Sequence, residues 1–311
     1  MFEGDYHYGL ATLVNSLVHS GFQGVVWSGY RGPLPPWVSR LQDENHIKEF
    51  RVNQECAIRF VPLSTSAHFT NYKPQFMKQI FETLDPHIDA LFYFDPDIVT
   101  KCSWSFFEEW VSCGIALVED VNSPLPENHP RRCAWRRIYA KNGLELRFAT
   151  ERYVNGGFVG IARVDRSFLD LWSRAQDIMA QEIGSLEFAG LSGRAATGQK
   201  HPSENPFSKT DQDALNAAVE ASPSRFSMMG KEGMDFKPGG FTMSHAAGPS
   251  KPWRKKFVWA AINGVAPTSA DKGFLRHSQT PIPIYSPAVF QLERLSLRLG
   301  SVVGRLVRRT G

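Results

Sequence analysis

Two carboxylates separated by one proline, Asp95 and Asp97, follow a short apolar run in this chain of 311 residues. The run, residues 90–94, predicts a buried strand. Residues at i and i+2 of an extended segment point the same way, and Pro96 favours extended geometry at Asp95. Two converging carboxylates are costly without a cation between them, and oxygen ligands suit Mg²⁺ or Mn²⁺. A solvated Asp-Pro-Asp turn is the alternative interpretation.

Polar residues that secondary structure alone does not explain occur again in the second half of the chain. Residues 153–161 predict a strand with Asn155 and two glycines inside it, which indicates either close approach of a ligand or a plain bulge. Further along, Thr210 or Asp211 can cap a helix, but capping gives no reason for Gln212. Both stretches are therefore candidates for ligand contacts.

A histidine near residue 250 stands in a third pattern of this kind. His245 lies beside the turn Gly248-Pro249, whose amides can face an anion, and before Lys251, which is suited to a phosphate. A lone histidine is more often structural than a ligand, so this pattern alone leaves both interpretations open.

The elements that must position these residues alternate between helix and strand. The apolar spacing predicts helices over residues 6–20, 75–84, 106–111 and 167–183, and strands over residues 24–28, 57–62, 90–94 and 114–118. Such alternation predicts an α/β fold with a mainly parallel sheet, whose ligands bind at the carboxyl ends of the strands. Asp95, Asp97 and Asp120 all follow predicted strands. Only Met1 and Phe2 precede the Glu3-Gly4-Asp5 stretch before the first helix, so either the sheet begins with a stub or the true start lies upstream.

Taken together, these stretches resemble the retaining GT-A glycosyltransferases of the family that includes glycogenin and bacterial lipooligosaccharide galactosyltransferases, glycosyltransferase family 8. The resemblance covers about residues 3–257. Residues 92–99 are similar to the DxD motif of the family, residues 153–157 to its Asn-small-Gly strand, residues 211–216 to its Asp-Gln-Asp helix start, and residues 245–253 to its His-x-x-Gly-Pro-x-Lys-Pro-Trp segment. The resemblance implies a GT-A fold, which is a Rossmann-like nucleotide-diphospho-sugar transferase fold with a mostly parallel central sheet flanked by helices.

The resemblance also implies a role for each matched position. Asp95, Asp97 and His245 would bind Mn²⁺ or Mg²⁺. The implied contacts to the nucleotide and diphosphate are those of Tyr6 with uracil, Asp5 and Glu3 with the base and ribose, Gly248 and Lys251 with the diphosphate, and Lys73 as a weaker candidate for the diphosphate. The implied contacts to the donor sugar are those of Asn155, Gly156, Asp120 and Asp211, with Gln212 beneath the anomeric carbon. Gln212, Asp211 and Asp120 form the predicted catalytic set.

The predicted activity is transfer of a sugar from a UDP-sugar to a glycan or glycolipid acceptor, with retention implied by the resemblance. Gln212 is a poor nucleophile because its amide is neutral, so we favour same-face attack by the acceptor hydroxyl over a covalent intermediate. The alternative is a catalytically impaired sugar-nucleotide or glycan binder of the same fold. A nucleotidyltransferase is a third candidate, but the chain has no glycine-rich phosphate loop near its start.

An arginine-rich stretch is the candidate acceptor region. It contains Trp135, which is flanked by four arginines and has a histidine nearby: Arg131, Arg132, Arg136, Arg137 and His129. Aromatic faces stack on sugar rings and arginines pair with carboxylates or phosphates, which predicts an acidic or phosphorylated glycan acceptor. A solvated basic loop is the alternative.

The net positive charge of the chain lies at its C-terminal end. Residues 290–311 hold five arginines against one glutamate, which equals the whole net charge of +4. A neutral body argues against a nucleic-acid partner. In this segment Leu292, Leu295, Leu299, Val302 and Leu306 share one helical side, next to Arg294, Arg298, Arg305 and Arg309. The pattern predicts an amphipathic helix on an anionic membrane surface, with packing onto the domain as the alternative.

We therefore expect a GT-A catalytic domain over residues 1–265 and a C-terminal extension over residues 266–311. Residues 190–209 are rich in Gly, Ser, Lys and Pro, which predicts a mobile loop. Four cysteines without metal or CxxC spacing, and no signal sequence, predict a cytoplasmic protein, peripheral on the inner face of the membrane where the C-terminal helix binds it.

Overall fold

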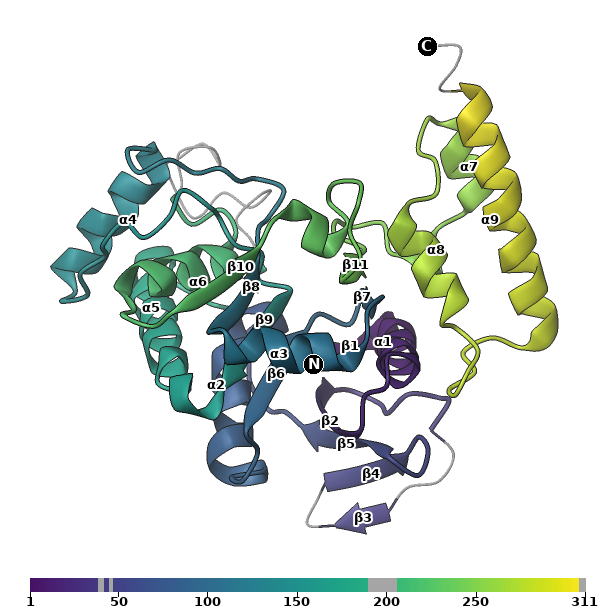
Figure 1. Ribbon diagram of the computed structural model, residues 1–311, viewed down its shortest axis with the longest axis horizontal. Coiled ribbons are helices and arrows are strands. Elements are labelled where there is room, and N and C mark those ends of the chain that lie inside the picture. Colours follow the sequence, from purple (N-terminus) through teal and green to yellow (C-terminus); the bar gives the residue numbers. More distant parts are fainter. Residues whose placement is uncertain (39–41, 45–46, 190–205, 308–311) are drawn as a thin grey trace. The chain divides into compact units, whose positions relative to one another are not determined.

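The computed structural model describes most of the chain as two compact units (Figure 1). The described residues are 1–38, 42–44, 47–189 and 206–307. Unit 1 comprises Met1–Leu63, Asp95–Ser105 and Glu232–Gly311, and unit 2 comprises Ser64–Phe94 and Phe106–Lys231. Residues 190–205 of the predicted mobile loop lie outside the described residues. Each unit is assembled from segments that are far apart in the sequence.

The main sheet of unit 1 has the strand order β1-β2-β5-β4-β3. The strands are β1 (Phe2–Glu3), β2 (Gly24–Arg31), β3 (Gln42–Glu44), β4 (Ile47–Arg51) and β5 (Cys56–Pro62). β1, β2 and β5 pair in parallel, and β4 and β3 continue the sheet in antiparallel pairs. The first strand has two residues, which pair with the end of β2 at Tyr30 and Arg31.

Helix α1 (His7–His19) covers this sheet. Its apolar side, with Leu10 and Val14, belongs to one buried cluster with Ile58 and Phe60 of β5. Glycine follows the helix at Gly21, where φ is +86° and a residue with a side chain would be strained. The predicted helix over residues 6–20 is therefore observed, and it turns directly towards β2.

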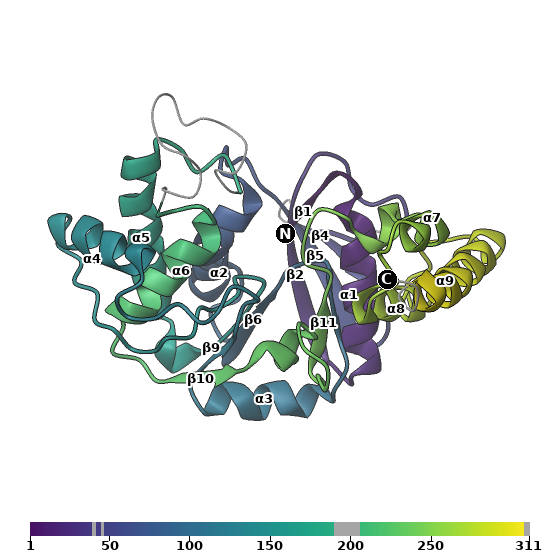
Figure 2. The same cartoon turned by 90° about the horizontal axis from the view of Figure 1, so that it is seen from above.

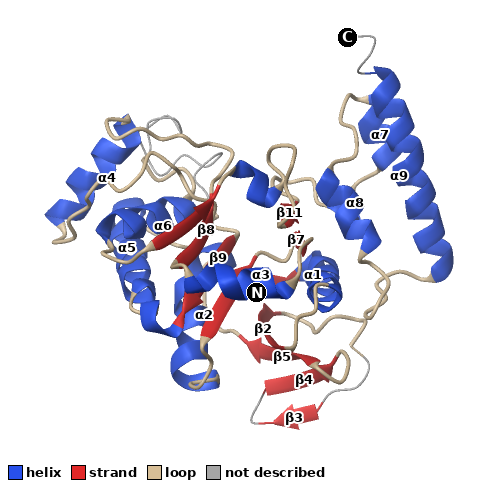
Figure 3. Ribbon diagram, in the orientation of Figure 1, coloured by secondary structure: helices blue, strands red, loops and turns tan. Residues whose placement is uncertain are grey.

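Apart from η1, the remaining elements of unit 1 belong to its two later segments, Asp95–Ser105 and Glu232–Gly311. They are η1 (Gly4–Tyr6), β7 (Ile98–Thr100), β11 (Met243–His245), η7 (Pro252–Arg254), α7 (Phe257–Ile262), α8 (Ser269–Arg276) and α9 (Pro287–Val307), with η6 (Lys231–Met234) at the boundary. β7 and β11 form a separate antiparallel pair. The long helix α9 lies beside α7 (Figure 3). No helix in the described part of the chain is both long and apolar enough to cross a bilayer.

The sheet of unit 2 has the order β10-β8-β9-β6. Its strands are β6 (Ala90–Phe94), β8 (Ile115–Val118), β9 (Phe158–Ala162) and β10 (Phe226–Met229). β8 and β10 are parallel, whereas β9 runs antiparallel to both β8 and β6. The helical elements are η2 (Phe69–Tyr72), α2 (Lys73–Gln79), the π-helical turn η3 (Ile80–Leu84), α3 (Trp104–Ser112), α4 (Pro130–Lys141), η4 (Arg163–Asp165), α5 (Phe168–Ile183) and α6 (Thr210–Ala221). α5 and α6 pack side by side (Figure 2).

The core of unit 2 is aromatic. The rings of Phe94, Phe107 and Phe158 lie 5.0 to 5.9 Å apart, in tilted or edge-on contacts.

The element order and the sheets of the two units confirm the predicted α/β class with flanking helices and a C-terminal amphipathic helix. One boundary was wrong: β9 begins at Phe158 rather than at residue 153, because Gly156 and Gly157 form a turn before it.

Candidate metal centre and polar cluster

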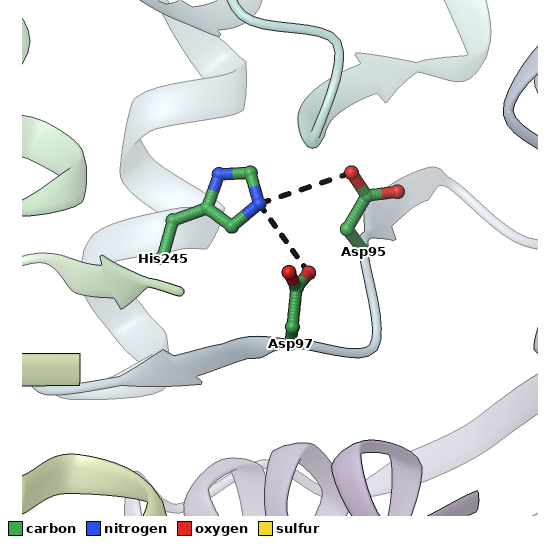
Figure 4. A group of neighbouring side chains, drawn as sticks. All are labelled: Asp95, Asp97 and His245. Atoms are coloured by element: carbon green, nitrogen blue, oxygen red, sulfur yellow. Dashed lines mark ion pairs between the residues drawn. The ribbon is translucent and has the colours of Figure 1, made fainter. Parts of the chain in front are cut away.

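Three predicted metal ligands converge in unit 1 (Figure 4). Nε2 of His245 lies 3.3 Å from Oδ1 of Asp97 and 4.0 Å from Oδ2 of Asp95. One ligand atom of each residue lies within 4.8 Å of the other two. We refer to Asp95, Asp97 and His245 as the metal cluster.

The backbone explains why residues so distant in sequence meet here. Asp95 and Asp97 occupy a tight turn before β7, closed by a hydrogen bond from the Ile98 amide to the Asp95 carbonyl. β11 pairs with β7 so that His245 lies opposite Ile98, and the amide of Ala246 donates to the carbonyl of Asp97 at 3.0 Å. The β7–β11 pair therefore determines the distance between the imidazole and the two carboxylates.

A glycine on α1 allows the turn to sit close to that helix. A Cβ atom built on Gly9 would lie 2.3 Å from the carbonyl oxygen of Pro96 and 2.9 Å from the ring of Trp253. Real Cβ atoms do not approach a backbone oxygen so closely, so any other residue at position 9 would displace the turn that carries both carboxylates. This role of Gly9 was not predicted, because a glycine within a helix gives no signal of what packs against it.

The charges around the metal cluster compensate one another. Lys251 donates from Nζ to Oδ2 of Asp97 and, at 3.0 Å, to the carbonyl of Ala246. Burial acts to raise the pKa of Asp97, but His245 and Lys251 outweigh it and hold that pKa well below its usual range. Burial acts to lower the pKa of His245, but Asp97 and Asp95 outweigh it and raise that pKa. The cluster thus favours cationic partners for its carboxylates.

The donor set fits a divalent cation of the Mg²⁺ or Mn²⁺ class. Two carboxylates and one imidazole are ligands such ions accept, and the three ligand atoms are close enough to share one ion. Nδ1 of His245 is buried without a hydrogen-bond partner in the described residues, so Nε2 is the nitrogen presented to the carboxylates. The structure supports a divalent metal site without identifying the ion.

An aromatic ring with charged neighbours lies next to Lys251. The ring of Tyr6 contacts Trp253 edge-on at 5.4 Å, and the Lys251 Nζ and the Arg254 guanidinium lie 5.9 and 5.5 Å from its centre. Arg254 also pairs with Asp5 and holds the pKa of that carboxyl below its usual range. Arg254 was not among the predicted contacts, although it directly follows the matched segment that ends at Trp253.

Glu3 and Gly248 are the other two predicted nucleotide contacts in unit 1. Glu3 pairs with Arg31 at 2.9 Å, across the short pairing of β1 with β2. Gly248 lies in an exposed turn with φ of +93°, a conformation that residues with a side chain rarely adopt. The backbone geometry therefore requires glycine at this position of the loop between β11 and Lys251.

The predicted sugar contacts come together separately, within unit 2. Nδ2 of Asn155 donates to Oδ2 of Asp120 at 2.6 Å and to Oε1 of Gln212 at 3.2 Å. Oδ1 of Asn155 accepts from the amide of Gly157, which shapes the turn before β9. Nε2 of Gln212 is buried and has no hydrogen-bond acceptor in the described residues. An unpaired buried amide is costly, and a ligand oxygen would satisfy it.

Asp211 is held at the same cluster by a lysine. Nζ of Lys73, which is fully buried, donates to the carbonyl of Gly156 at 2.7 Å and to Oδ2 of Asp211 at 3.0 Å. A Cβ atom on Gly156 would lie 2.8 Å from that same carboxylate oxygen. Lys73 was predicted as a weaker diphosphate contact, and in this structure its ammonium serves two protein acceptors. We refer to Asp120, Asn155, Asp211 and Gln212 as the polar cluster.

One further cation, Lys209, was not predicted. Its Nζ lies 3.8 Å from Oδ1 of Asp120, and its amide donates to Oδ2 of Asp213. It immediately precedes the first residue of α6, so its only sequence signal was its position next to the predicted helix start.

The predicted acceptor region includes two buried residues that have structural partners. It forms helix α4 rather than a loop, and Trp135 is fully buried, with its indole donating to the carbonyl of Pro206. Arg132 is also buried and pairs with Glu220. Both interpretations, acceptor contact and solvated loop, were therefore wrong for these two residues. Nothing in the spacing of the basic residues shows that Glu220, 88 positions away, neutralises Arg132.

Arg131 neutralises Asp213, the residue that follows Gln212 of the polar cluster. It pairs with Asp213, which also accepts from the Tyr153 hydroxyl at 2.7 Å and from the amide of Lys209. Burial raises the pKa of Asp213 to about 6, although Arg131 and Tyr153 oppose that shift. Asp213 follows Gln212 directly, so this buried network fixes the start of α6.

No protein-family model matches the chain, and no curated protein matches its sequence. Solved structures do match it. A crystal structure of LgtC with an active-site glutamine replaced by glutamate aligns over 94% of this chain and 98% of its own, at 11% identity and a TM-score of 0.51. The galactosyltransferase LgtC with donor and acceptor sugar analogs aligns over the same shares at 12% identity and a TM-score of 0.48.

The bifunctional glycosyltransferase WbbM also aligns, at 15% identity and a TM-score of 0.46. The alignment covers 89% of this chain and 50% of WbbM, so the chain spans about half the length of that protein. At such low identity a likeness concerns the fold, and the likeness to the LgtC mutant shows that this chain has the GT-A fold.

Proposed function

We propose that this GT-A chain is a metal-dependent glycosyltransferase of the family 8 type. It would transfer a sugar from a UDP-sugar to a hydroxyl of a glycan or glycolipid. The metal cluster carries the proposal, since two carboxylates and an imidazole meet beside Lys251, which is 154 residues from Asp97 in the sequence. The shared fold with LgtC supports it.

The residues of unit 1 are suited to a nucleoside diphosphate. Mn²⁺ or Mg²⁺ at Asp95, Asp97 and His245 would neutralise the charge that develops on the leaving diphosphate. Lys251 would add a second positive charge to the diphosphate. The Tyr6 ring offers a stacking surface for a base, flanked by the Asp5–Arg254 pair.

The residues of unit 2 are suited to the donor sugar. Asp120 and Asp211 are carboxylates that can stabilise an oxocarbenium-like transition state, and the Asn155 amide orients Asp120. The free Nε2 of Gln212 can donate to a sugar or phosphate oxygen. We propose transfer with retention by same-face attack, because a neutral amide at Gln212 is a poor nucleophile.

The test is hydrolysis of a panel of UDP-sugars with and without Mn²⁺, after a thermal-shift screen with UDP. We expect one UDP-sugar to be hydrolysed slowly, and EDTA to abolish hydrolysis. Asp97→Asn should lose both the Mn²⁺ dependence and the activity, while Asp235→Asn, outside the metal cluster, should retain the metal response. Hydrolysis that continues unchanged in EDTA would refute metal dependence.

The alternative, a catalytically impaired binder of the same fold, predicts a different result. UDP and Mn²⁺ would stabilise the protein, but no UDP-sugar would be turned over. Asp120 and Gln212 both accept from the side-chain amide of Asn155, and Asp211 pairs with Lys73. All three predicted catalytic side chains are thus held by named partners, which favours the active enzyme.

We also propose that the enzyme works in the cytoplasm, peripheral to the inner face of a membrane. All four cysteines are free, which suits a reducing compartment. Fractionation of cells expressing the full chain would test this placement.

A further inference from the structure

A cavity in unit 1 lies on the other face of the β7–β11 pair from the imidazole of the metal cluster. Neighbouring residues of a strand point to opposite faces, so His245 faces the two carboxylates while Ser244 and its partner Val99 face this cavity. Its volume is about 630 Å³, within the range of small-molecule sites. Among the described residues that line it, none belongs to the metal cluster. We call it the α8 pocket.

The walls of the α8 pocket come from α1, from β7 with the residues that follow it, and from α8 (Figure 1). α8 lies directly on β7, because a Cβ atom on Gly273 would lie 2.7 Å from Cγ2 of Val99. The buried Asn15 of α1 holds the end of α8, since its Nδ2 donates to the carbonyls of His277 at 2.7 Å and of Ile282 at 2.8 Å. The walls of the pocket are therefore fixed by the packing of unit 1.

The charged side chains of the pocket are mainly cationic. The described lining contains Lys101, Lys272 and Arg276, the imidazoles of His19 and His277, and one carboxylate, Asp235. Nζ of Lys101 donates to both carboxylate oxygens of Asp235 at 2.9 Å. Because these two charges neutralise each other, the pocket keeps an excess of positive charge at Lys272 and Arg276.

Lys272 and Arg276 have no anionic partner in the described part of the chain. They are four positions apart on α8 and therefore share one helical face, and both are exposed. The only carboxylate of α8 is Asp271, which is buried and accepts from Lys255 and from the amide of Thr268. Like charges at this spacing repel, and an anion bound between them would remove the repulsion.

His277 shows the effect of this positive charge. Its ring lies 5.1 Å from that of His19, and burial together with His19 and Arg276 lowers its pKa to about 4. Its Nδ1 is buried and has no hydrogen-bond partner among the described residues. The pocket therefore has a positive potential that Asp235, already paired with Lys101, does not cancel.

The uncharged part of the lining is rich in hydroxyl groups. They belong to Ser20, Thr100, Ser103, Ser244 and Ser269. A hydroxyl can both donate and accept, as the hydroxyls of a sugar do. The described lining contains no Phe, Tyr or Trp, so a nucleotide base would find no ring of that size to stack on. This lining favours a polyhydroxylated ligand with a compact negative group.

We infer that the α8 pocket binds a phosphorylated sugar, with the phosphate between Lys272 and Arg276 and the sugar against the serine and threonine hydroxyls. A phosphate monoester carries close to two negative charges and three acceptor oxygens. It therefore matches an ammonium and a guanidinium on one helical face better than the single charge of a carboxylate does. This site is separate from the metal cluster, and the inference does not depend on the reaction proposed above.

The test is calorimetric titration of the full chain with the 6-phosphates of glucose, galactose and mannose, in EDTA so that no metal binds the phosphate. We expect saturable binding of at least one of them and none of unphosphorylated glucose. Lys272→Ala/Arg276→Ala should bind at least about tenfold more weakly, because hydrogen bonds from two charged groups are lost. Arg294→Ala/Arg298→Ala removes the same charge at the same spacing from exposed positions of α9, and it should bind like the wild type.

Nuclear magnetic resonance of the histidine side chains locates the bound phosphate. The ring resonances of His277 and His19, assigned with His277→Gln and His19→Gln, should shift as the sugar phosphate is added. The resonance of His245 should stay in place. A shift of His245 alone would put the phosphate at Lys251 and overturn the inference.

Three calorimetric results would also overturn it. They are no binding of any of the three sugar phosphates at millimolar concentration, unchanged affinity in Lys272→Ala/Arg276→Ala, and an equal loss in the two double variants, which would indicate a general effect of net charge. Inorganic phosphate that binds as tightly as the best sugar phosphate would refute the role of the hydroxyls. Unchanged circular dichroism of each variant ensures that a loss of binding is not a loss of folding.

Discussion

At the scale of single residues, Gln212 has a buried amide whose oxygen is paired and whose nitrogen lacks an acceptor in the described residues. The partner of the oxygen is Asn155. A purely structural glutamine would satisfy both ends of the amide. Gln212 is therefore the residue of the polar cluster whose structure most directly indicates a ligand.

Gln212→Ala should lower the rate of UDP-sugar hydrolysis about tenfold or more, because a donor to the reacting sugar or phosphate is lost. The affinity for UDP alone should change less than about twofold, since UDP lacks the sugar. Steady-state hydrolysis and calorimetric titration of UDP measure the two effects. Gln181→Ala, at an exposed position of α5, is the control. Equal losses of UDP affinity and rate would place Gln212 at the nucleotide instead.

The Arg131–Asp213 pair is a residue-scale feature of stability rather than catalysis. Arg131→Ala should cost about 3 to 5 kcal/mol of unfolding free energy, because it leaves the Asp213 carboxylate buried without its cation. Arg137→Ala, at an exposed position of the same helix, should cost less than about 0.5 kcal/mol. The double variant Arg131→Ala/Asp213→Asn should be more stable than Arg131→Ala alone. Urea denaturation of the four proteins checks this, and a double variant weaker than the single one would contradict it.

At the scale of elements, two packing contacts position the metal cluster. The β7–β11 pair places His245, and the contact between α1 and the Asp-Pro-Asp turn places the carboxylates. β7 and β11 have three residues each, so their mutual register matters more than the stability of either strand alone.

Gly9→Ala isolates the second contact. Alanine in place of glycine within a helix normally adds about 1 kcal/mol of stability. Here the new Cβ atom meets the Pro96 carbonyl oxygen, so we expect a loss of stability and at least about tenfold weaker Mn²⁺ binding. Thermal unfolding and a Mn²⁺ titration followed by electron paramagnetic resonance measure both. A more stable variant with unchanged Mn²⁺ affinity would show that the turn is not held by α1.

At the scale of the whole molecule, acid stability depends on buried groups with opposite effects. Burial, together with the nearby His19 and Arg276, lowers the pKa of His277 to about 4. Between about pH 6.5 and pH 4 the unfolded chain binds a proton there that the folded chain does not, so the folded state loses stability as the pH falls. The raised pKa of Asp213, about 6, has the opposite sign, because its folded form binds the proton first.

His277→Gln separates these two contributions. The wild type should lose more unfolding free energy than the variant between about pH 7 and about pH 5, while Asp213 contributes equally to both proteins. Urea denaturation at the two pH values gives the comparison. Equal losses in the two proteins would show that His277 is not excluded from protonation in the folded state.

The sequence by itself was enough to predict the α/β class and most elements that carry the site. It also picked out the Asp-Pro-Asp turn, the start of α6 and His245 as candidate ligands. These features depend on neighbours a few positions away, through helical period, strand alternation and capping, and such local preferences are visible in a single sequence.

Only the tertiary structure showed which groups meet. It buried Trp135 and paired Arg132 with Glu220, it placed Gly9 against Pro96, and it exposed the leucines of α9 by packing the helix through its glycines. Each of these depends on a contact between distant segments, and the free energy of burial or pairing is set by the partner rather than by the residue type. A stretch rich in arginine or leucine can therefore lie at the surface or in the core. Which of the two it does depends on whether the fold brings a partner against it.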